Sequence, residues 1–234
     1  MILHIPHASL NLADCSFECD IDIELERMTD HRTDELFEHE PAVRIVSLVS
    51  RLVCDVERFI DDAKEPMALK GMGVCYETNS FGKPLRVVST GEKQLIINNY
   101  YNPHHENLEK AVSDSLDKNG HALVIDCHSF SNTPLPHEDS QHTPRPDICI
   151  GTDEFHTPME LTELAVNHFR TLGYNVTMND PFDGSIVPML YYRKNNLVRS
   201  LMIEVNRSIY KNNFEKVKSD ISSCLNILEQ HKIT

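Results

Sequence analysis

The sequence predicts an α/β fold in which a largely parallel sheet lies between helices. Apolar runs of strand length alternate with amphipathic helical segments along the chain, which is typical of this class. One run, residues 122–126 (Ala-Leu-Val-Ile-Asp), is continuously apolar until its last residue. Such runs are typical of strands that are buried on both faces, as in a parallel sheet.

The elements follow from apolar spacing and from helix breakers. Helices are expected where apolar residues recur on one face, and Pro41, Pro103 and Gly173 mark breaks, starts or stops. The expected helices are 33–49, 99–118, 158–172 and 214–232, and the expected strands are 2–5, 53–56, 122–126, 147–151, 175–179 and 201–205. No linker divides the chain, so one domain covering 1–234 is expected. Segments 65–92 and 129–146 remain irregular, and ordered loops of this length usually form the wall or lid of a site.

Charge and hydropathy exclude several classes of function. The formal net charge of −14 argues against nonspecific binding to nucleic acid or to an anionic membrane. An anionic small-molecule substrate remains compatible, because a local pair of arginines can override the global sign. No apolar run approaches the roughly 18 residues of a membrane-spanning helix. The first residues lack the features of a signal peptide, so a cytoplasmic location is the default expectation.

Motifs of other enzyme classes are missing. The sequence has no Gly-x-Ser-x-Gly elbow of a serine hydrolase and no glycine-rich nucleotide-binding loop. Cys15 and Cys19 lack a second pair, which argues against a structural zinc site. Cys127 lies beside His128, but a cysteine at the end of a buried strand more often packs as a small apolar residue.

Histidine, carboxylate and arginine recur just beyond the expected strands. Ligands of open α/β sheets bind beyond the carboxyl ends of the strands. His7 follows the first expected strand, Arg58 the second and His128 the third, while Glu204 lies in the last strand and Arg207 follows it. The recurrence at one edge indicates a site.

These residue types match a hydrolytic zinc centre. Two histidines and a carboxylate supply three of the four positions of Zn²⁺, and the fourth is left for water. His7 and His128 are the expected histidine ligands. The acidic ligand is expected from Asp30 or Asp34, which lie four residues apart and share a face if this segment is helical. Alternatives are that His7 bonds its own turn and that Asp30 caps a helix.

The other polar residues have expected roles in catalysis. Glu204 would take a proton from the water and return it to the leaving amine, or it would form a structural ion pair. Arg58 or Arg207 would bind a substrate carboxylate through two hydrogen bonds. His105 would contact the substrate or the transition state, and Asp126 would anchor its loop or orient His128.

The motifs together resemble the N-formylglutamate amidohydrolase family. Their shared order over nearly the whole chain carries the resemblance: Ile5-Pro-His-Ala-Ser9, Thr29-Asp30 with Asp34-Glu-Leu-Phe37, Arg51-x-x-x-Asp55-x-x-Arg58, Pro103-His-His105, Asp126-x-His128-Ser129, Asn179-Asp-Pro-Phe-x-Gly184 and Glu204-x-Asn206-Arg207-Ser-x-Tyr210. Three motifs depart from the family pattern. Ala8-Ser9 replaces Ser-Gly, Glu57 replaces an asparagine, and Gly184-Ser185 replaces a pair of glycines.

The resemblance implies a fold and a set of roles. The fold would be a three-layer αβα sandwich with a mostly parallel or mixed sheet, similar to zinc carboxypeptidases. One zinc ion would be held by His7, Asp30 (favoured over Asp34) and His128, with Glu204 as the base. Arginine, together with Asn206 of the last motif, would bind the substrate.

The sequence therefore predicts zinc-dependent hydrolysis of a C–N bond in a small N-acylated amino acid, N-formyl compounds included. Two alternatives stay open at this point. One is a carboxypeptidase-like metallopeptidase that acts on short peptides or cell-wall fragments. The other is a ligand-binding member of the family without catalysis. The oligomeric state is not determined by the sequence.

Overall fold

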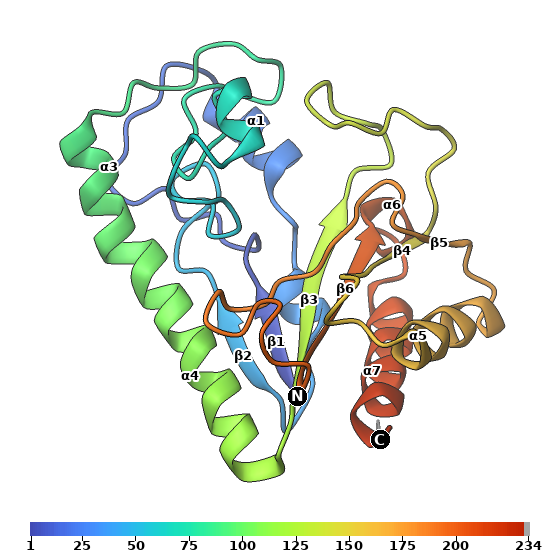
Figure 1. Cartoon of the computed structure of the whole chain (residues 1–234). Helices are drawn as coiled ribbons and strands as arrows, with labels where there is room; N and C mark the ends of the chain where they lie inside the picture. Colours follow the sequence, from blue (N-terminus) through green and yellow to red (C-terminus); the bar gives the residue numbers. More distant parts are fainter. Residues whose placement is uncertain (232–234) are drawn as a thin grey trace.

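The computed structural model describes residues 1–231 and has a six-stranded sheet at its centre, with helices on both faces (Figure 1). The strands lie in the order β2-β1-β3-β6-β4-β5, and β4 runs antiparallel to β6 but parallel to β5. Their bounds are β1 Ile2–Ile5, β2 Val43–Val46, β3 Ala122–Phe130, β4 Ile148–Gly151, β5 Val176–Met178 and β6 Val198–Asn206. The predicted α/β class is confirmed, and the sheet is mixed.

Two apolar layers hold the helices against the sheet. On one face, α5 (Met159–Thr171) and α7 (Phe214–Gln230) pack with α2 (Thr33–Leu36) in a cluster that includes Leu3, Ile125 and Ile203. On the other face, α4 (Asn102–Asn119) packs through Leu108 and Val112. Figure 1 shows α4 on one side of the sheet and α5 and α7 on the other. Burial of these apolar faces, at about 25 cal/mol per Å², is the main favourable term of folding.

A cap of irregular chain lies beyond the carboxyl ends of β1, β3 and β6 (Figure 1). It contains α1 (Ile21–Met28), the 3₁₀ helix η1 (Pro66–Lys70) and the start of α3 (Thr90–Ile96), which continues through the π-helical η2 (Ile97–Tyr101) into α4. A separate apolar cluster of Met28, Leu52, Met72, Tyr76 and Leu85 orders this cap. The short helix α6 (Arg207–Tyr210) follows β6.

Two sequence predictions, for residues 53–56 and 33–49, were wrong. Residues 53–56 form no strand; Val53, Cys54 and Val56 are buried in irregular chain against Val74 and Ile97. The apolar run 53–56 thus shows that the segment is buried, and ordered loops can be as buried as short strands.

The expected helix 33–49 is only the single turn of α2, followed by β2, because parallel pairing with β1 outweighs local helical spacing. The other helices lie where they were expected, apart from their ends. The last residue of the predicted helix 214–232 lies outside the described residues. Within residues 1–231, no helix is long and apolar enough to cross a membrane.

Candidate active site

Three neighbouring strands bring the predicted polar residues to one edge of the sheet. In β3 and β6, His128 pairs directly with Glu204, so the two side chains leave the same face side by side. His7 follows β1, which is the other neighbour of β3. All three residues, together with Asp30, line a cavity of about 800 Å³.

The imidazole ring of His7 is held at Nε2 by the carboxylate of Asp55. Its Nε2 donates to Asp55 Oδ1 at 2.9 Å. Its Nδ1 is buried and has no hydrogen-bond partner among the described residues, and it lies 3.7 Å from Asp30 Oδ2. A buried lone pair without a donor is costly in a protein interior. The orientation therefore presents a bare nitrogen to the cavity.

His128 is arranged in the same way. Its Nε2 donates to Asp126 Oδ1 at 3.0 Å, and its Nδ1 lies 3.1 Å from Asp30 Oδ2. Burial acts to lower the pKa of His128, but the carboxylates of Glu57, Asp126 and Asp30 raise this pKa well above its usual value. The surroundings favour positive charge at this ring, which a proton or a metal ion on Nδ1 supplies.

A buried chain of hydrogen bonds continues behind His128. Asp126 Oδ1 also accepts from His4 Nδ1 at 2.8 Å, and His4 Nε2 lies 2.8 Å from His104 Nε2. Since a carboxylate only accepts, His4 carries a proton on Nδ1, and a second proton is shared between Nε2 of His4 and Nε2 of His104. Burial, before all other causes, lowers the pKa of His104 to about 2, so this ring is neutral. The chain fixes the Asp126 carboxylate that orients His128.

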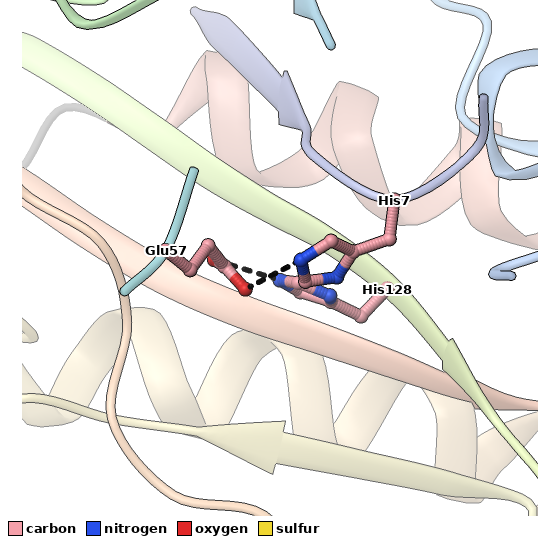
Figure 2. Close-up of side chains that lie close together, drawn as sticks. All are labelled: His7, Glu57 and His128. Carbon is pink, nitrogen blue, oxygen red and sulfur yellow. Dashed lines mark hydrogen bonds and ion pairs between the residues drawn. The ribbon is translucent and has the colours of Figure 1, made fainter. Parts of the chain in front are cut away.

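Glu57 places a further carboxylate beside both histidines (Figure 2). Its Oε1 lies 3.2 Å from His128 Nε2, and its Oε2 lies 3.5 Å from His7 Nε2. One ligand atom from each of the three residues fits within 4.8 Å, so His7, Glu57 and His128 are spaced to hold a metal ion. Glu57 also shares a group of this spacing with His4 and Asp126.

The donor set fits a divalent cation such as Zn²⁺. Nε2 of each histidine donates a hydrogen bond to a carboxylate. A metal-ligating histidine usually makes such a hydrogen bond through the nitrogen that does not bind the metal. Asp30 Oδ2 faces Nδ1 of both rings, and although burial acts to raise the pKa of Asp30, its hydrogen bond with His128 and its interaction with His7 lower this pKa. Asp30 is therefore ionised and available as the acidic ligand, with Glu57 as a second carboxylate on the Nε2 side.

Glu204 lies next to this group without a partner of its own. Its Oε2 is buried and, within residues 1–231, has no hydrogen-bond partner. Burial raises the pKa of Glu204 to about 8, with smaller contributions from the negative charges of Asp30 and Glu57. No arginine ion pair of Glu204 is found in the described part of the chain, so the alternative of a structural pair is not realised. A carboxylate of this kind is suited to exchanging a proton near neutral pH.

Comparison with known proteins places this arrangement in a family. The family model of N-formylglutamate amidohydrolase matches residues 1–211. The chain belongs to this family. It is accordingly an amidohydrolase, a hydrolase of C–N bonds. No curated protein sequence matches the chain.

Two solved structures share the fold of this family member. The crystal structure of N-formylglutamate amidohydrolase from Ralstonia eutropha is 23% identical, with a TM-score of 0.84, and the match covers 97% of this chain and 92% of that one. A structure of a gene product from Agrobacterium tumefaciens is 17% identical, with a TM-score of 0.72, covering 98% of this chain and 91% of that one.

Two arginines lie where the amidohydrolase cavity meets Asp55. Arg51 Nη2 donates to Asp55 Oδ2 at 2.9 Å, and Arg58 Nη2 lies 3.6 Å from the same oxygen. Both arginines line the cavity, and Nε of Arg58 is buried with no hydrogen-bond partner among residues 1–231. The partly exposed guanidinium of Arg58 thus brings positive charge to the cavity wall, where a substrate carboxylate can meet it. Arg51 belongs to a quoted motif but was not predicted as a binding residue.

Arg207 also lines the cavity but has structural contacts. Its Nη1 donates to the backbone oxygens of Glu26, Arg27 and Thr29, which fixes the end of α1 immediately before Asp30. This arginine therefore positions the acidic residue of the site.

Asn206 and His105 lie apart from the histidine group. The side-chain amide of Asn206 donates to Asn132 Oδ1 and to the backbone oxygen of Pro146, and its Oδ1 caps α6 at Ser208, so these contacts serve the loop and the helix. His105 Nε2 donates to the backbone oxygen of Val56 at 2.7 Å, next to Glu57. Asp34, the alternative to Asp30, is absent from the described cavity lining.

The motif 179–184 forms a wall of the cavity because a glycine lets it approach the sheet. A Cβ on Gly151 would lie 2.5 Å from the backbone oxygen of Gly184 and 2.3 Å from Met202 Cε. Gly184 itself has φ of +84°, a left-handed conformation that glycine adopts at little cost. Asp180, Phe182 and Asp183 of this segment line the cavity.

Proposed function

We propose that the chain is a zinc-dependent amidohydrolase of N-acylated amino acids. The observation that carries the proposal is that Nδ1 of His7 and Nδ1 of His128 both face Oδ2 of Asp30, at 3.7 and 3.1 Å, while their Nε2 atoms are held by Asp55 and Asp126. These three residues would hold the ion on the Nδ1 side of the two rings, and Glu57 adds negative charge on their Nε2 side. When bound, zinc supplies a Lewis acid that activates water and polarises a carbonyl.

The side chains divide the remaining work. Glu204 accepts the proton of the attacking water and passes it to the leaving nitrogen, for which its pKa of about 8 and its unpartnered oxygen are suited. Arg58, together with Arg51, binds the carboxylate of the amino-acid half. Burial acts to lower the pKa of Arg58, but Asp55 keeps it raised, so the guanidinium is charged at every physiological pH.

Metal analysis and a conservative variant test the proposal. Purified protein is expected to contain one zinc ion per chain, and Glu204→Gln is expected to keep that zinc while kcat falls at least about a thousandfold. Protein that lacks stoichiometric zinc and gains no activity from added metal would refute the metal dependence. Full activity of Glu204→Gln would exclude Glu204 as the base.

The substrate class is tested with a panel at fixed enzyme concentration. N-formyl and N-acetyl amino acids are expected to be hydrolysed faster than short peptides or cell-wall fragments. Faster cleavage of the peptides would favour the carboxypeptidase-like alternative. Zinc-loaded protein that is inactive on the whole panel would favour a ligand-binding role.

A further inference from the structure

A second cavity opens beside the first and is mostly apolar. It has a volume of about 340 Å³, within the range of small-molecule pockets. Its walls include Phe59, Tyr101, Val187, Met189 and Tyr192.

The two cavities adjoin each other beside the histidine group. Glu57, Arg58, Asp183 and Met202 line both of them, and the second cavity also reaches Asp126. Glu57 and Asp126 both contact Nε2 of His128. The apolar cavity thus approaches the histidine group from the side opposite Asp30, which faces Nδ1 of the same ring.

The apolar walls remain partly open to solvent. Phe59 is 47% exposed and Met189 is 61% exposed, whereas Val187 and Met202 are buried at 6% each. Single exposed apolar residues are ordinary, but here they surround the mouth of a cavity whose deeper part is also apolar. Covering them with an apolar group would be favourable.

The two cavities differ chemically, and each suits a different half of an N-acyl amino acid. The first cavity contains the paired arginines and therefore suits the carboxylate of the amino-acid half. The amide must lie at His7, His128 and Glu204. The second cavity adjoins the first along Glu57, Arg58 and Met202, and Arg51 is outside its described lining. It is therefore the neighbouring space for the acyl half.

We propose that this second cavity is the acyl subsite and that it takes an uncharged acyl group of several carbons. This assignment rests on the proposed hydrolysis of N-acyl amino acids and names the acyl half of the substrate. A formyl group would leave the cavity unfilled. Acyl groups that end in a carboxylate are disfavoured, because the three carboxylates of Glu57, Asp126 and Asp183 outnumber the one guanidinium, Arg58, in the described lining.

A series of N-acylglutamates tests the assignment in the zinc-loaded protein. The acyl chain is lengthened from formyl through acetyl and butanoyl to hexanoyl, and kcat/KM is measured for each. We expect kcat/KM to rise about fourfold per added methylene, the gain for burying one such group. N-succinylglutamate is expected to react more slowly than the butanoyl compound, which has the same chain length without the charge.

Two wall variants and one matched control separate the cavity from the fold. Phe59→Ala and Met189→Ala remove exposed side chains and are expected to lower kcat/KM about tenfold for the hexanoyl compound and less than about twofold for the formyl compound. Leu190→Ala removes a side chain that is 53% exposed and next in sequence, but is outside the described lining of either cavity. It is expected to leave both values unchanged.

Three results would overturn the subsite. The first is a fall in kcat/KM with acyl length while N-formylglutamate is hydrolysed well; the amidohydrolase proposal would then survive alone. The second is a gain that follows the size of the amino-acid side chain in N-formyl compounds, which would assign the cavity to the amine half. The third is equal losses in Leu190→Ala and Met189→Ala. Inactivity on every compound would instead refute the substrate class of the proposed function.

Discussion

The strands and the irregular cap contribute to the site in different ways. Strands β3 and β6 supply His128 and Glu204 in fixed register, on adjacent chains of a buried sheet. The cap supplies Asp30, Asp55, Glu57 and Arg58 from turns whose positions depend on contacts distant in sequence. A strand holds its residue through a continuous backbone ladder, whereas Asp30 and Asp55 of the cap have isolated backbone hydrogen bonds and further side-chain partners. Cap residues should therefore be more sensitive to the loss of one polar partner.

The largest expected effect separates the carboxylates of Asp30 and Asp34. Asp30→Asn is expected to weaken zinc binding at least about a hundredfold, because zinc binding energies of about 10–16 kcal/mol are shared among three protein ligands. Asp34→Asn, the matched control four residues away, is expected to bind zinc like the wild type. Competition with a chelator measures both affinities. Equal losses would remove the distinction between the two residues.

The second prediction compares the carboxylates behind the two histidines. Asp55→Asn and Asp126→Asn are both expected to weaken zinc binding about 10–100-fold, as partners of metal-ligating histidines do. Only Asp55 is also bound by Arg51 and by the Tyr76 hydroxyl, at 2.9 and 2.6 Å. Asp55→Asn should therefore cost about 3–5 kcal/mol of stability in the metal-free protein. Urea unfolding measures this cost, and a larger loss for Asp126→Asn would reverse the comparison.

Glu204 of β6 should make the stability of the metal-free protein depend on pH. In the metal-free folded protein the pKa of Glu204 is raised from 4.5 to about 8 by burial. The folded state then binds more protons than the unfolded state between these two values, so this group lowers stability as pH rises through that window. Glu204→Gln should therefore be more stable than the wild type at pH 8, by up to a few kcal/mol.

The same variant provides its own control at low pH. Below about pH 4.5 the carboxyl is protonated in both states, and the two proteins should unfold at the same temperature. Thermal unfolding after chelation measures the difference across the range. A stability difference that is constant from pH 4 to pH 8 would contradict the raised pKa.

The smallest expected effect lies where the two regions touch. Gly151→Ala is expected to cost about 1–3 kcal/mol and to lower activity, because its Cβ would collide with the backbone oxygen of Gly184. Gly91→Ala in α3 is the control; its Cβ would meet no atom within 4 Å, and a small gain in stability is expected. Equal melting temperatures for the two variants would show that segment 179–184 adapts freely.

The sequence by itself determined the fold class, most strands of the sheet and the strand-borne residues of the site. Continuous apolar runs identify buried strands, and the carboxyl ends of parallel strands meet at one edge, so His7, His128 and Glu204 were predicted together. The match of residues 1–211 to the family agrees with the resemblance of the ordered motifs.

Only the tertiary structure decided what the irregular chain does. Residues 53–56 have the spacing of a strand, yet they are a buried turn, since apolar periodicity records burial and not pairing. Side-chain roles in such chain depend on distant partners. Arg207 is bound to the backbone at the end of α1, His105 to Val56, and Asn206 to the loop that precedes β4. The departure of Glu57 from the family pattern was visible in the sequence, but its position between two histidines and two cavities required the folded chain.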